Sequence, residues 1–381
     1  MKINPALAMA LSALSAGILI SCVKPAEENK VSEVDSQVAQ ESATSTTPDK
    51  KDNNAEKISA VDISPDTEKT YLTHVANDIV IPAYADAAKQ SDLLHDLAKK
   101  SCQQAPVSGD ALKELRDQWL VLAQAWASAE MVNFGPATAS MSNLYINYYP
   151  DERGLVHSGV ADLIAANSKL TAEQLANESA IVQGVPGLEE VLYANDNLDA
   201  GQCAYVMSAS SALSTRLKDI EKNWQQNATD LLAIDKTAES DQGLNQWFNS
   251  LLSLVETMKS NAIDQPLGLT AKAKGHLPAA TAGQSRAIIT AKLATLNQAM
   301  TDPVLTAILG GNNENAVADS LSTALADTTT LLAQMPEDLA TADKATQQEL
   351  LDHLTSITRI IKRQLIPTLG LRVGFNSTDG D

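Results

Sequence analysis

Apolar residues recur at spacings of three and four positions along most of the chain after residue 66. This spacing predicts amphipathic helices, because residues three and four apart lie on one face of a helix. No comparable run alternates with the period of two that a half-buried strand requires. The clearest stripes begin at Leu112, Leu213, Trp247 and Leu350. The pattern therefore predicts an all-α fold.

Segments rich in glycine and proline separate the stripes and predict where helices end. They lie at 133–140, 148–154, 264–284 and 309–316. Pro82 follows an apolar stretch of the first predicted helix. Because proline lacks the backbone N–H and crowds the preceding turn, we expect that helix to kink or break there.

The order of stripes and breaks predicts two packed four-helix-type bundles. The helix that ends near residue 236 would complete a set of four that begins at residue 66. We therefore expect an N-terminal helical bundle at 66–235 and a C-terminal helical bundle at 236–381, each built from antiparallel helices around an apolar core.

Residues 1–22 have the features of an export signal and not of the fold. Lys2 provides a positive start, and the apolar residues 6–20 are too few to span a bilayer comfortably. They end in the letters LISC, at 19–22. This motif resembles the lipobox of bacterial lipoproteins, in which the cysteine is lipidated and becomes the first residue of the mature chain. A plain signal peptide is the alternative, but we expect Cys22 to carry the lipid and to anchor the protein in a membrane.

Residues 23–65 are polar, charged and poor in large apolar groups. Such a segment cannot bury enough surface to offset the entropy of ordering, so we expect a disordered tether. The residue directly after Cys22 is Val23. In the lipoproteins that the motif resembles, an aspartate at this position would imply sorting to a membrane other than the outer membrane. The lipobox resemblance therefore implies an outer-membrane lipoprotein that faces the periplasm.

The charge of the chain argues against one class of partner. It has 47 acidic and 28 basic residues and a net charge of −19. A chain with this balance repels phosphate backbones, so we expect no nucleic-acid partner.

Two of the three cysteines remain after lipidation of Cys22, namely Cys102 and Cys203. In the oxidising periplasm an even pair predicts one disulfide, and two buried free thiols are the alternative. The bond would close a loop of about 100 residues and stabilise the fold by about 4–5 kcal/mol in the chain-entropy model.

Six short segments form an ordered set of landmarks across residues 66–381. They are VIPAY (80–84), WASAEMVNFGPA (126–137), INYYP (146–150), GVPGLEEVLY (184–193), QPLGL (265–269) and GLRVGFNSTDGD (370–381). In this order they resemble the imelysin family, a peptidase-like group of periplasmic proteins linked to iron uptake. The resemblance implies two four-helix-type bundles that are related as a degenerate repeat, with a candidate site between them.

The sequence departs from the family at its signature, Gly-x-His-x-x-Glu. Gly184 and Glu189 occupy the matching positions, but Pro186 stands where the family has histidine. Proline has no lone pair for a metal, and the histidines of this chain form no His-x-x-His pattern. A metallopeptidase is therefore disfavoured, because a catalytic zinc site needs about three protein ligands.

Four acidic residues are the candidate ligand or metal-binding groups: Glu189, Glu130, Asp379 and Asp381. Glu130 matches the family's motif glutamate, and the two aspartates belong to its Asp-Gly-Asp ending. Oxygen ligands of this kind suit iron or another cation that prefers oxygen. A structural explanation stays open for Glu189 and Glu190. Pro186 would start a helix, and glutamates in its first turn would interact favourably with the helix dipole.

These features lead to one expected function and two alternatives. We expect an imelysin-like outer-membrane lipoprotein that binds a metal ion or a metal-bearing ligand in iron acquisition or homeostasis. Its expected partners are the membrane, through Cys22, and components of iron uptake. The alternatives are a metallopeptidase-like enzyme and a scaffold lipoprotein that has only a vestigial pocket, and whether the chain is an enzyme stays open.

Overall fold

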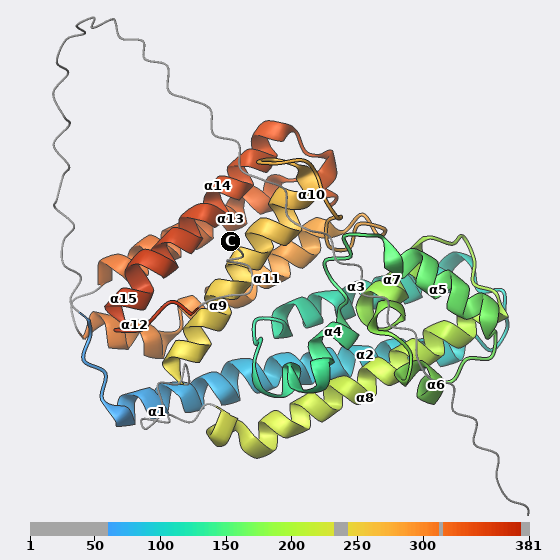
Figure 1. The fold of residues 1–381 in the computed structure, drawn as a ribbon, viewed down its shortest axis with the longest axis horizontal. Helices are drawn as coiled ribbons and strands as arrows, with labels where there is room; N and C mark the ends of the chain where they lie inside the picture. Colours follow the sequence, from blue (N-terminus) through green and yellow to red (C-terminus); the bar gives the residue numbers. More distant parts are fainter. Residues whose placement is uncertain (1–59, 232–242, 312–314, 375–381) are drawn as a thin grey trace, which may run out of the picture. The chain divides into compact units, whose positions relative to one another are not determined.

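The computed structural model describes residues 60–231, 243–311 and 315–374. They belong to one compact unit, Glu56–Asp381. Within these ranges the chain forms helices and loops and no β-strand, apart from an isolated bridge between Val107 and Leu198 (Figure 1). The prediction of an all-α fold is confirmed.

Four longer helices pack as a closed set in the first half of the chain. They are α2 (Ile81–Ser101), α3 (Gly109–Ala129), α7 (Gly184–Tyr193) and α8 (Ala200–Leu231). Helix α2 contacts α3 and α8, and α7 contacts the same two helices. Three shorter helices connect α3 to α7, namely α4 (Ser142–Ile146), α5 (Leu155–Ala166) and α6 (Ala172–Ala176).

A second closed set follows the same plan. It consists of α9 (Leu244–Lys259), α11 (Ser285–Met300), α13 (Asn315–Gln334) and α14 (Lys344–Ile360). Helix α14 contacts α9 and α13, and α11 contacts the same two helices. The short helices here are α10 (Gln265–Leu267), α12 (Pro303–Gly310) and α15 (Ile366–Thr368). The contacts agree with two four-helix sets, while the expected boundary near residue 236 lies outside the described residues.

Contacts of α3 and of α1 are among those that hold the sets together. Helix α3 packs against α11. Helix α1 (Pro65–His74) precedes α2 and extends to the second set, where the ring of Tyr71 stacks on Phe248 at a centroid distance of 6.2 Å. His74 Nε2 lies 2.7 Å from Asp302 Oδ2, which ties α1 to the start of α12. The surface between α3 and α11 is where the candidate site lies.

Pro82 does not break the first helix. A π-helical segment, Val75–Val80, joins α1 to α2 without interruption, and Pro82 is the second residue of α2. Proline has no backbone N–H to donate, and the wider turn of the π-helix lets the helix continue without that hydrogen bond. The same arrangement recurs before Pro266 and Pro367, where π-helical segments precede α10 and α15. The expected break at Pro82 is therefore wrong, and a local change of helical pitch precedes the proline instead.

The N-terminal edge of the described chain belongs to the body. Val61 is buried and its N–H donates to the carbonyl of Thr368 at 2.7 Å. Ser64 then caps α1 by accepting from the N–H of Thr67. The last residues of the expected 23–65 tether are therefore packed, and residues 23–59 lie outside the described part.

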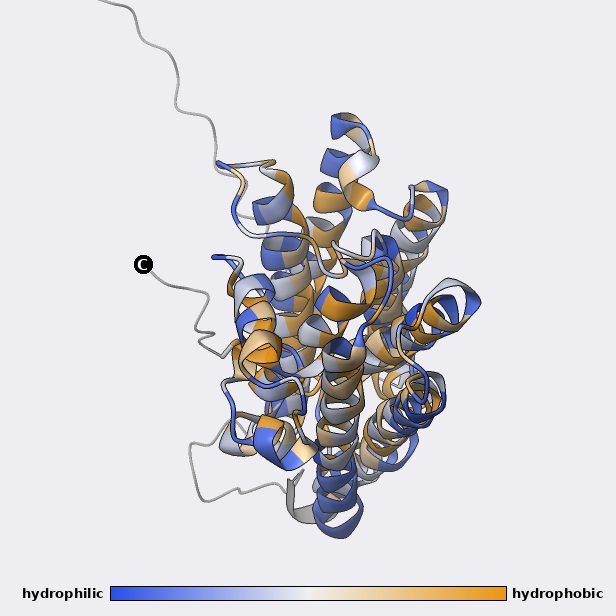
Figure 2. Cartoon of the chain, turned by 90° about the vertical axis from the view of Figure 1, so that its right-hand side faces the viewer, coloured by the Kyte–Doolittle hydropathy of each residue, from blue (hydrophilic) through white to orange (hydrophobic). Residues whose placement is uncertain are grey.

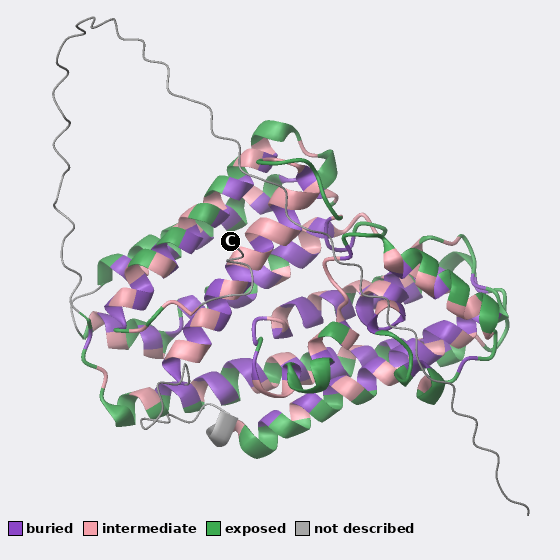
Figure 3. Ribbon diagram, in the orientation of Figure 1, coloured by how far each residue is buried: buried purple, intermediate pink, exposed green. Residues whose placement is uncertain are grey.

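The apolar stripes point inward as their spacing predicts. Figure 3 shows buried positions along the faces where helices meet, and Figure 2 shows that hydrophobic residues gather on those faces. The largest fully buried side chains include Trp119 of α3, Trp224 of α8 and Trp247 of α9. Tryptophans in these stripes therefore fill the core.

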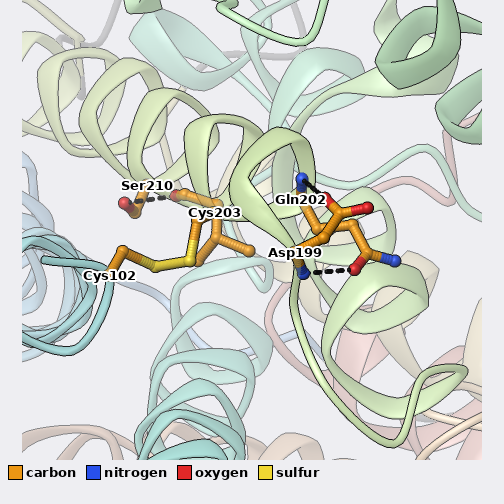
Figure 4. Close-up of a disulfide and its surroundings, with 6 residues drawn as sticks. Cys102, Asp199, Gln202, Cys203 and Ser210 are labelled. Atoms are coloured by element: carbon orange, nitrogen blue, oxygen red, sulfur yellow. Dashed lines mark hydrogen bonds between the residues drawn. A yellow bond between two sulfur atoms is a disulfide. The ribbon is translucent and has the colours of Figure 1, made fainter. Parts of the chain in front are cut away.

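A disulfide joins Cys102, directly after α2, to Cys203 in the first turn of α8 (Figure 4). The start of α8 is held by a reciprocal pair, in which Asp199 and Gln202 each accept the other's backbone N–H at 2.8 Å. The disulfide prediction is confirmed.

None of the helices in the described ranges is both long enough and apolar enough to cross a bilayer. The expected signal segment 1–22 with its Cys22 lies outside those ranges. Asp379 and Asp381, two of the candidate ligands, also lie outside them.

Candidate functional site

Helix α7 is seated so closely that two of its positions require glycine. Gly184 has a φ of +70°, and a Cβ there would lie 2.1 Å from the carbonyl oxygen of Ile146. A Cβ on Gly187 would lie 2.2 Å from the hydroxyl of Tyr205, which donates to the carbonyl of Val182. Gly184 of the signature is therefore a packing residue that fixes where the rest of α7 lies.

The start of α7 changes the explanation of its glutamates. The helix begins at Gly184, two residues earlier than the proline predicts, so Glu189 and Glu190 lie beyond its first turn. The helix dipole acts mainly within the first turn and does not explain them. Glu190 instead lies 2.6 Å from Nδ1 of His157, near the surface.

Glu189 is buried, with 9% of its surface exposed. Its Oε1 accepts the N–H of Ala282 at 3.1 Å, and the N–H of Thr281 also stabilises the carboxylate. Burial raises the pKa of Glu189 to about 7, because desolvation outweighs these two backbone N–H groups, and the nearby charge of Glu190 adds to the increase.

Glu130, directly after α3, pairs with a lysine from the second set. Nζ of Lys292, on α11, lies 2.8 Å from Glu130 Oε2, and Lys292 is only 2% exposed. A buried ammonium needs such a partner, because removing a charge from water is costly. The ion pair therefore fixes α3 against α11 at the candidate site.

The loop that precedes α11 closes over this region. Tyr149 Oη lies 2.9 Å from the carbonyl of His276 and 3.0 Å from that of Asn261, and its proton is donated to one of them at a time. His276 Nδ1 donates to the carbonyl of Leu277 at 2.9 Å. Ala279 has a left-handed φ of +52°, which is unfavourable for a residue with a Cβ. The loop is therefore held in one particular conformation above α7.

A cavity of about 40 Å³ lies under this loop, and both Glu189 and Glu130 line it, with Lys292 beside them. The indole rings of Trp119 and Trp126 form part of its wall. A second cavity of about 180 Å³ adjoins it, and the two share the following lining residues: Trp126, Glu130, Asn147, Tyr149 and Lys292. We call the two together the central cavity.

A larger groove of about 670 Å³ runs along α8 and the 135–142 segment. Its charged lining groups are Glu173, Arg216 and Asp219, and it contains none of the candidate residues. The guanidinium of Arg216 already lies over the ring of Tyr145, 4.6 Å from its centroid. The chemistry of the candidates is therefore concentrated in the central cavity and not in this larger groove.

The family model described as Imelysin matches residues 80–364 of the chain. The chain belongs to the imelysin family. The match spans both helical sets and includes the α7 signature and Glu130. The family recognised from the six sequence segments is thereby confirmed.

Two solved structures resemble this imelysin-family chain. An imelysin-like protein from Psychrobacter arcticum 273-4 is 89% identical, with a TM-score of 0.82, and the alignment covers 84% of this chain and all of that one. A protein from Parabacteroides distasonis ATCC 8503, provisionally described as an iron-regulated protein A precursor, is 12% identical with a TM-score of 0.61. That alignment covers 80% of this chain and 97% of the other, and it shows a shared fold. No curated protein matches the sequence.

The side chains of the imelysin signature in this chain do not fit a bare metal ion. Within the described ranges no three His, Cys, Asp or Glu side chains come together as a metal site would require. Glu130 faces Lys292, and Glu189 accepts backbone N–H groups. Pro186 lines the cavity but offers no ligand atom. Glu130 is thus paired with a charge from within the protein, and Glu189 is held by backbone groups.

The fold brings together two of the four candidates predicted from the sequence, Glu189 and Glu130. The other two, Asp379 and Asp381, lie outside the described residues. Sequence reasoning missed Lys292, which sits within the apolar stripe of α11 beside Ile289 and Leu293. A single lysine on an otherwise buried helix face was the available signal, because such a group needs an acidic partner. The position of His276 could not be predicted either, since nothing in the sequence places its loop over α7.

Proposed function

We propose that this protein is an outer-membrane lipoprotein, facing the periplasm, that binds a metal-bearing ligand in iron acquisition or homeostasis. The observation that carries the proposal is the central cavity, in which two carboxylates and a buried lysine from both helical sets converge. Ionisable groups gathered in an interior cavity at the contact of two helical sets are typical of a ligand site.

The choice of a metal-bearing ligand over a bare ion follows from the donor atoms. A bare iron ion would need several free carboxylate or imidazole ligands, and no such group of three lies within the described ranges. A chelated metal brings its own ligands, and the cavity then has only to recognise the chelator. The connection to iron is supported by the fold shared with the protein described as an iron-regulated protein A precursor.

The proposed location is supported by the N-terminal sequence and by the disulfide. The LISC motif at 19–22 would direct lipidation of Cys22. A disulfide such as Cys102–Cys203 forms and persists in oxidising compartments, which include the periplasm. The lipid would make the membrane one partner of the protein, and iron-uptake components in the same membrane would be others.

Isothermal titration of the mature chain in detergent tests the binding function. We expect ferric chelates to bind more tightly than ferric, ferrous or zinc ions supplied with a weak buffer ligand. We also expect Glu189→Ala to weaken that binding, while Glu190→Ala, whose side chain pairs with His157 near the surface, leaves it unchanged. If neither ions nor chelates bind, the proposed function is wrong.

A further inference from the structure

Two buried polar atoms of the central cavity lack a hydrogen-bond partner. The indole Nε1 of Trp126, a residue that is 3% exposed, donates to nothing among the described residues. The carboxylate oxygen Oε2 of Glu130 is also buried, and no described group makes a hydrogen bond to it. Because an unpaired buried donor or acceptor is costly, one of each in the same cavity wall points to an occupant that satisfies both.

The ion pair with Lys292 does not supply the missing hydrogen bond of Glu130. Lys292 Nζ lies 2.8 Å from Glu130 Oε2, which is close enough for the charges to attract, but the two groups are not aligned as a hydrogen bond. Lys292 therefore balances the charge of Glu130, while Oε2 can still accept from a donor.

The unpaired donor and the unpaired acceptor face the same space. Glu130 follows Trp126 by four positions, one turn along α3 and its cap, so the two side chains lie on one face. Both residues line the smaller and the larger part of the central cavity. An occupant that reaches one of the two atoms can therefore reach the other.

The lining of the larger part has no net charge. Its charged side chains are Glu130 and Lys292, which balance each other, whereas Glu189 lines only the smaller part. An anion would be repelled by Glu130 and a cation by Lys292, and neither would find an unmatched opposite charge. An uncharged ligand therefore enters this space most favourably.

The size and shape of the larger part limit the group that enters. Its volume of about 180 Å³ holds about six water molecules, which corresponds to a group of about six non-hydrogen atoms. Leu144 also lines this part and is 37% exposed, so the space reaches the surface and a larger molecule can insert such a group. The aromatic residues Trp126 and Tyr149 line both parts, and their flat rings favour a planar group.

We propose that the larger part of the central cavity binds an uncharged amide or hydroxamate group, whose oxygen accepts from Trp126 Nε1 and whose N–H donates to Glu130 Oε2. A group of this kind is planar and carries a donor and an acceptor on neighbouring atoms. The inference rests on the proposed function in that the cavity binds a ligand. It specifies the chemistry of that ligand and predicts that a metal chelate bound there is uncharged.

The test compares three probes with one carbon skeleton, namely butyramide, butyrate and butyramidine, on the mature chain in detergent. Butyramide offers a donor and an acceptor without a charge, butyrate offers only acceptors, and the butyramidine cation offers only donors. Ligand-observed NMR titration measures the weak binding of such small molecules. We expect butyramide to bind at least about tenfold more tightly than the other two. Failure of butyramide to bind, or equally tight binding of butyrate, would overturn the proposal.

Trp126→Phe removes the indole N–H and keeps an aromatic ring. It should bind butyramide about tenfold more weakly than the unmodified protein. Trp224→Phe is the matched control, because Trp224 Nε1 is also buried without a described partner but Trp224 lines neither part of the central cavity. Its butyramide binding should be unchanged. Equal butyramide binding by Trp126→Phe and the unmodified protein would contradict the proposed contact.

Glu130→Gln leaves the charge of Lys292 unmatched, so the preference should invert and butyrate should bind more tightly than butyramide. Asp92→Asn is the control, since it leaves Lys218 unmatched at the surface and should keep the preference for butyramide. A folded Glu130→Gln protein that still prefers butyramide would overturn the proposal. If Glu130→Gln does not fold, the comparison of Trp126→Phe with Trp224→Phe decides.

Ferric chelates distinguish failure of this inference from failure of the proposed function. The uncharged ferric chelate of acetohydroxamate should bind about tenfold more tightly than anionic ferric citrate. Binding of butyramide without binding of either chelate would support the amide assignment and contradict the proposed function. Binding of ferric citrate at least as tight as that of the uncharged chelate would overturn the amide assignment and support the proposed function.

Discussion

Neighbouring glutamates on α7 illustrate how strongly environment decides the behaviour of a residue. Glu189 is buried under the loop before α11, while Glu190 pairs with His157 near the surface. The sequence marks Glu189 as a candidate through its position in the signature. It does not predict the burial, because the covering residues 281 and 282 lie about 90 positions away along the chain.

The raised pKa of Glu189 predicts how stability depends on pH. The folded protein holds this proton up to about pH 7, whereas an exposed glutamate loses it near pH 4.5. Between these values the folded state binds more protons than the unfolded state, so the free energy of unfolding falls as pH rises. The loss from this group amounts to about 3 kcal/mol and is complete above pH 7.

Chemical denaturation of Glu189→Gln between about pH 5 and 8 checks this expectation. The variant cannot ionise at this position, so its free energy of unfolding should decline less with pH than that of the unmodified protein. Glu190→Gln is the control and should keep the original pH dependence. Parallel pH profiles for the unmodified protein and Glu189→Gln would show that Glu189 is not protonated near neutrality.

At the scale of elements, the sequence predicts the helices more completely than it predicts how consecutive helices connect. The stripes that begin at Leu112 and Trp247 became α3 and α9, because a 3.6-residue period leaves one face to bury. The sequence did not predict that the helix continues through Pro82. A proline in a helical pattern does not reveal that a π-helical turn will let the helix continue without the hydrogen bond that proline lacks.

The start of α7 gives a test at this scale. Gly184→Ala combines a left-handed φ with a Cβ that would meet the backbone carbonyl of Ile146, which cannot move as a side chain could. We expect a loss of more than about 4 kcal/mol in the free energy of unfolding. Gly109→Ala is the matched control, because Gly109 also has a positive φ, of +57°, but nothing lies within 4 Å of its Cβ position.

The control should cost about 1–2 kcal/mol, the penalty of the left-handed conformation alone. Urea denaturation of both variants gives the comparison. Equal losses would mean that the close approach of α7 to Ile146 is not what requires glycine at position 184.

At the scale of the whole molecule, the spacing of apolar residues predicted the class of fold and the pair of cysteines predicted the disulfide, but neither predicted the surface where the helical sets meet. The ion pair between Glu130 and Lys292 depends on α3 lying against α11, a contact between residues 162 positions apart that no local pattern encodes. The central cavity is consequently a property of the assembled fold.

The disulfide between Cys102 and Cys203 should stabilise the folded protein as a whole. Replacing both Cys102 and Cys203 by serine reopens a loop with a sequence separation of 101 residues. We expect the free energy of unfolding to fall by about 4–5 kcal/mol, with an unfolded state that exposes more surface and a larger denaturant slope. A loss below about 1 kcal/mol would show that the bond contributes little to the fold.

Lipidation is tested in cells. The chain should incorporate a labelled fatty acid and fractionate with the outer membrane, and Cys22→Ser should abolish both, because the lipid supplies the anchor. Cys102→Ser is the control for loss of a cysteine elsewhere. Labelling that persists in Cys22→Ser would contradict the proposed location.

The most direct measurement for the account is a crystal structure of the mature chain grown with a ferric chelate. We predict density for the chelate in the central cavity between α3 and α11, in contact with lining residues from both helical sets. Density for the chelate in the groove along α8, with the central cavity holding only water, would contradict the account.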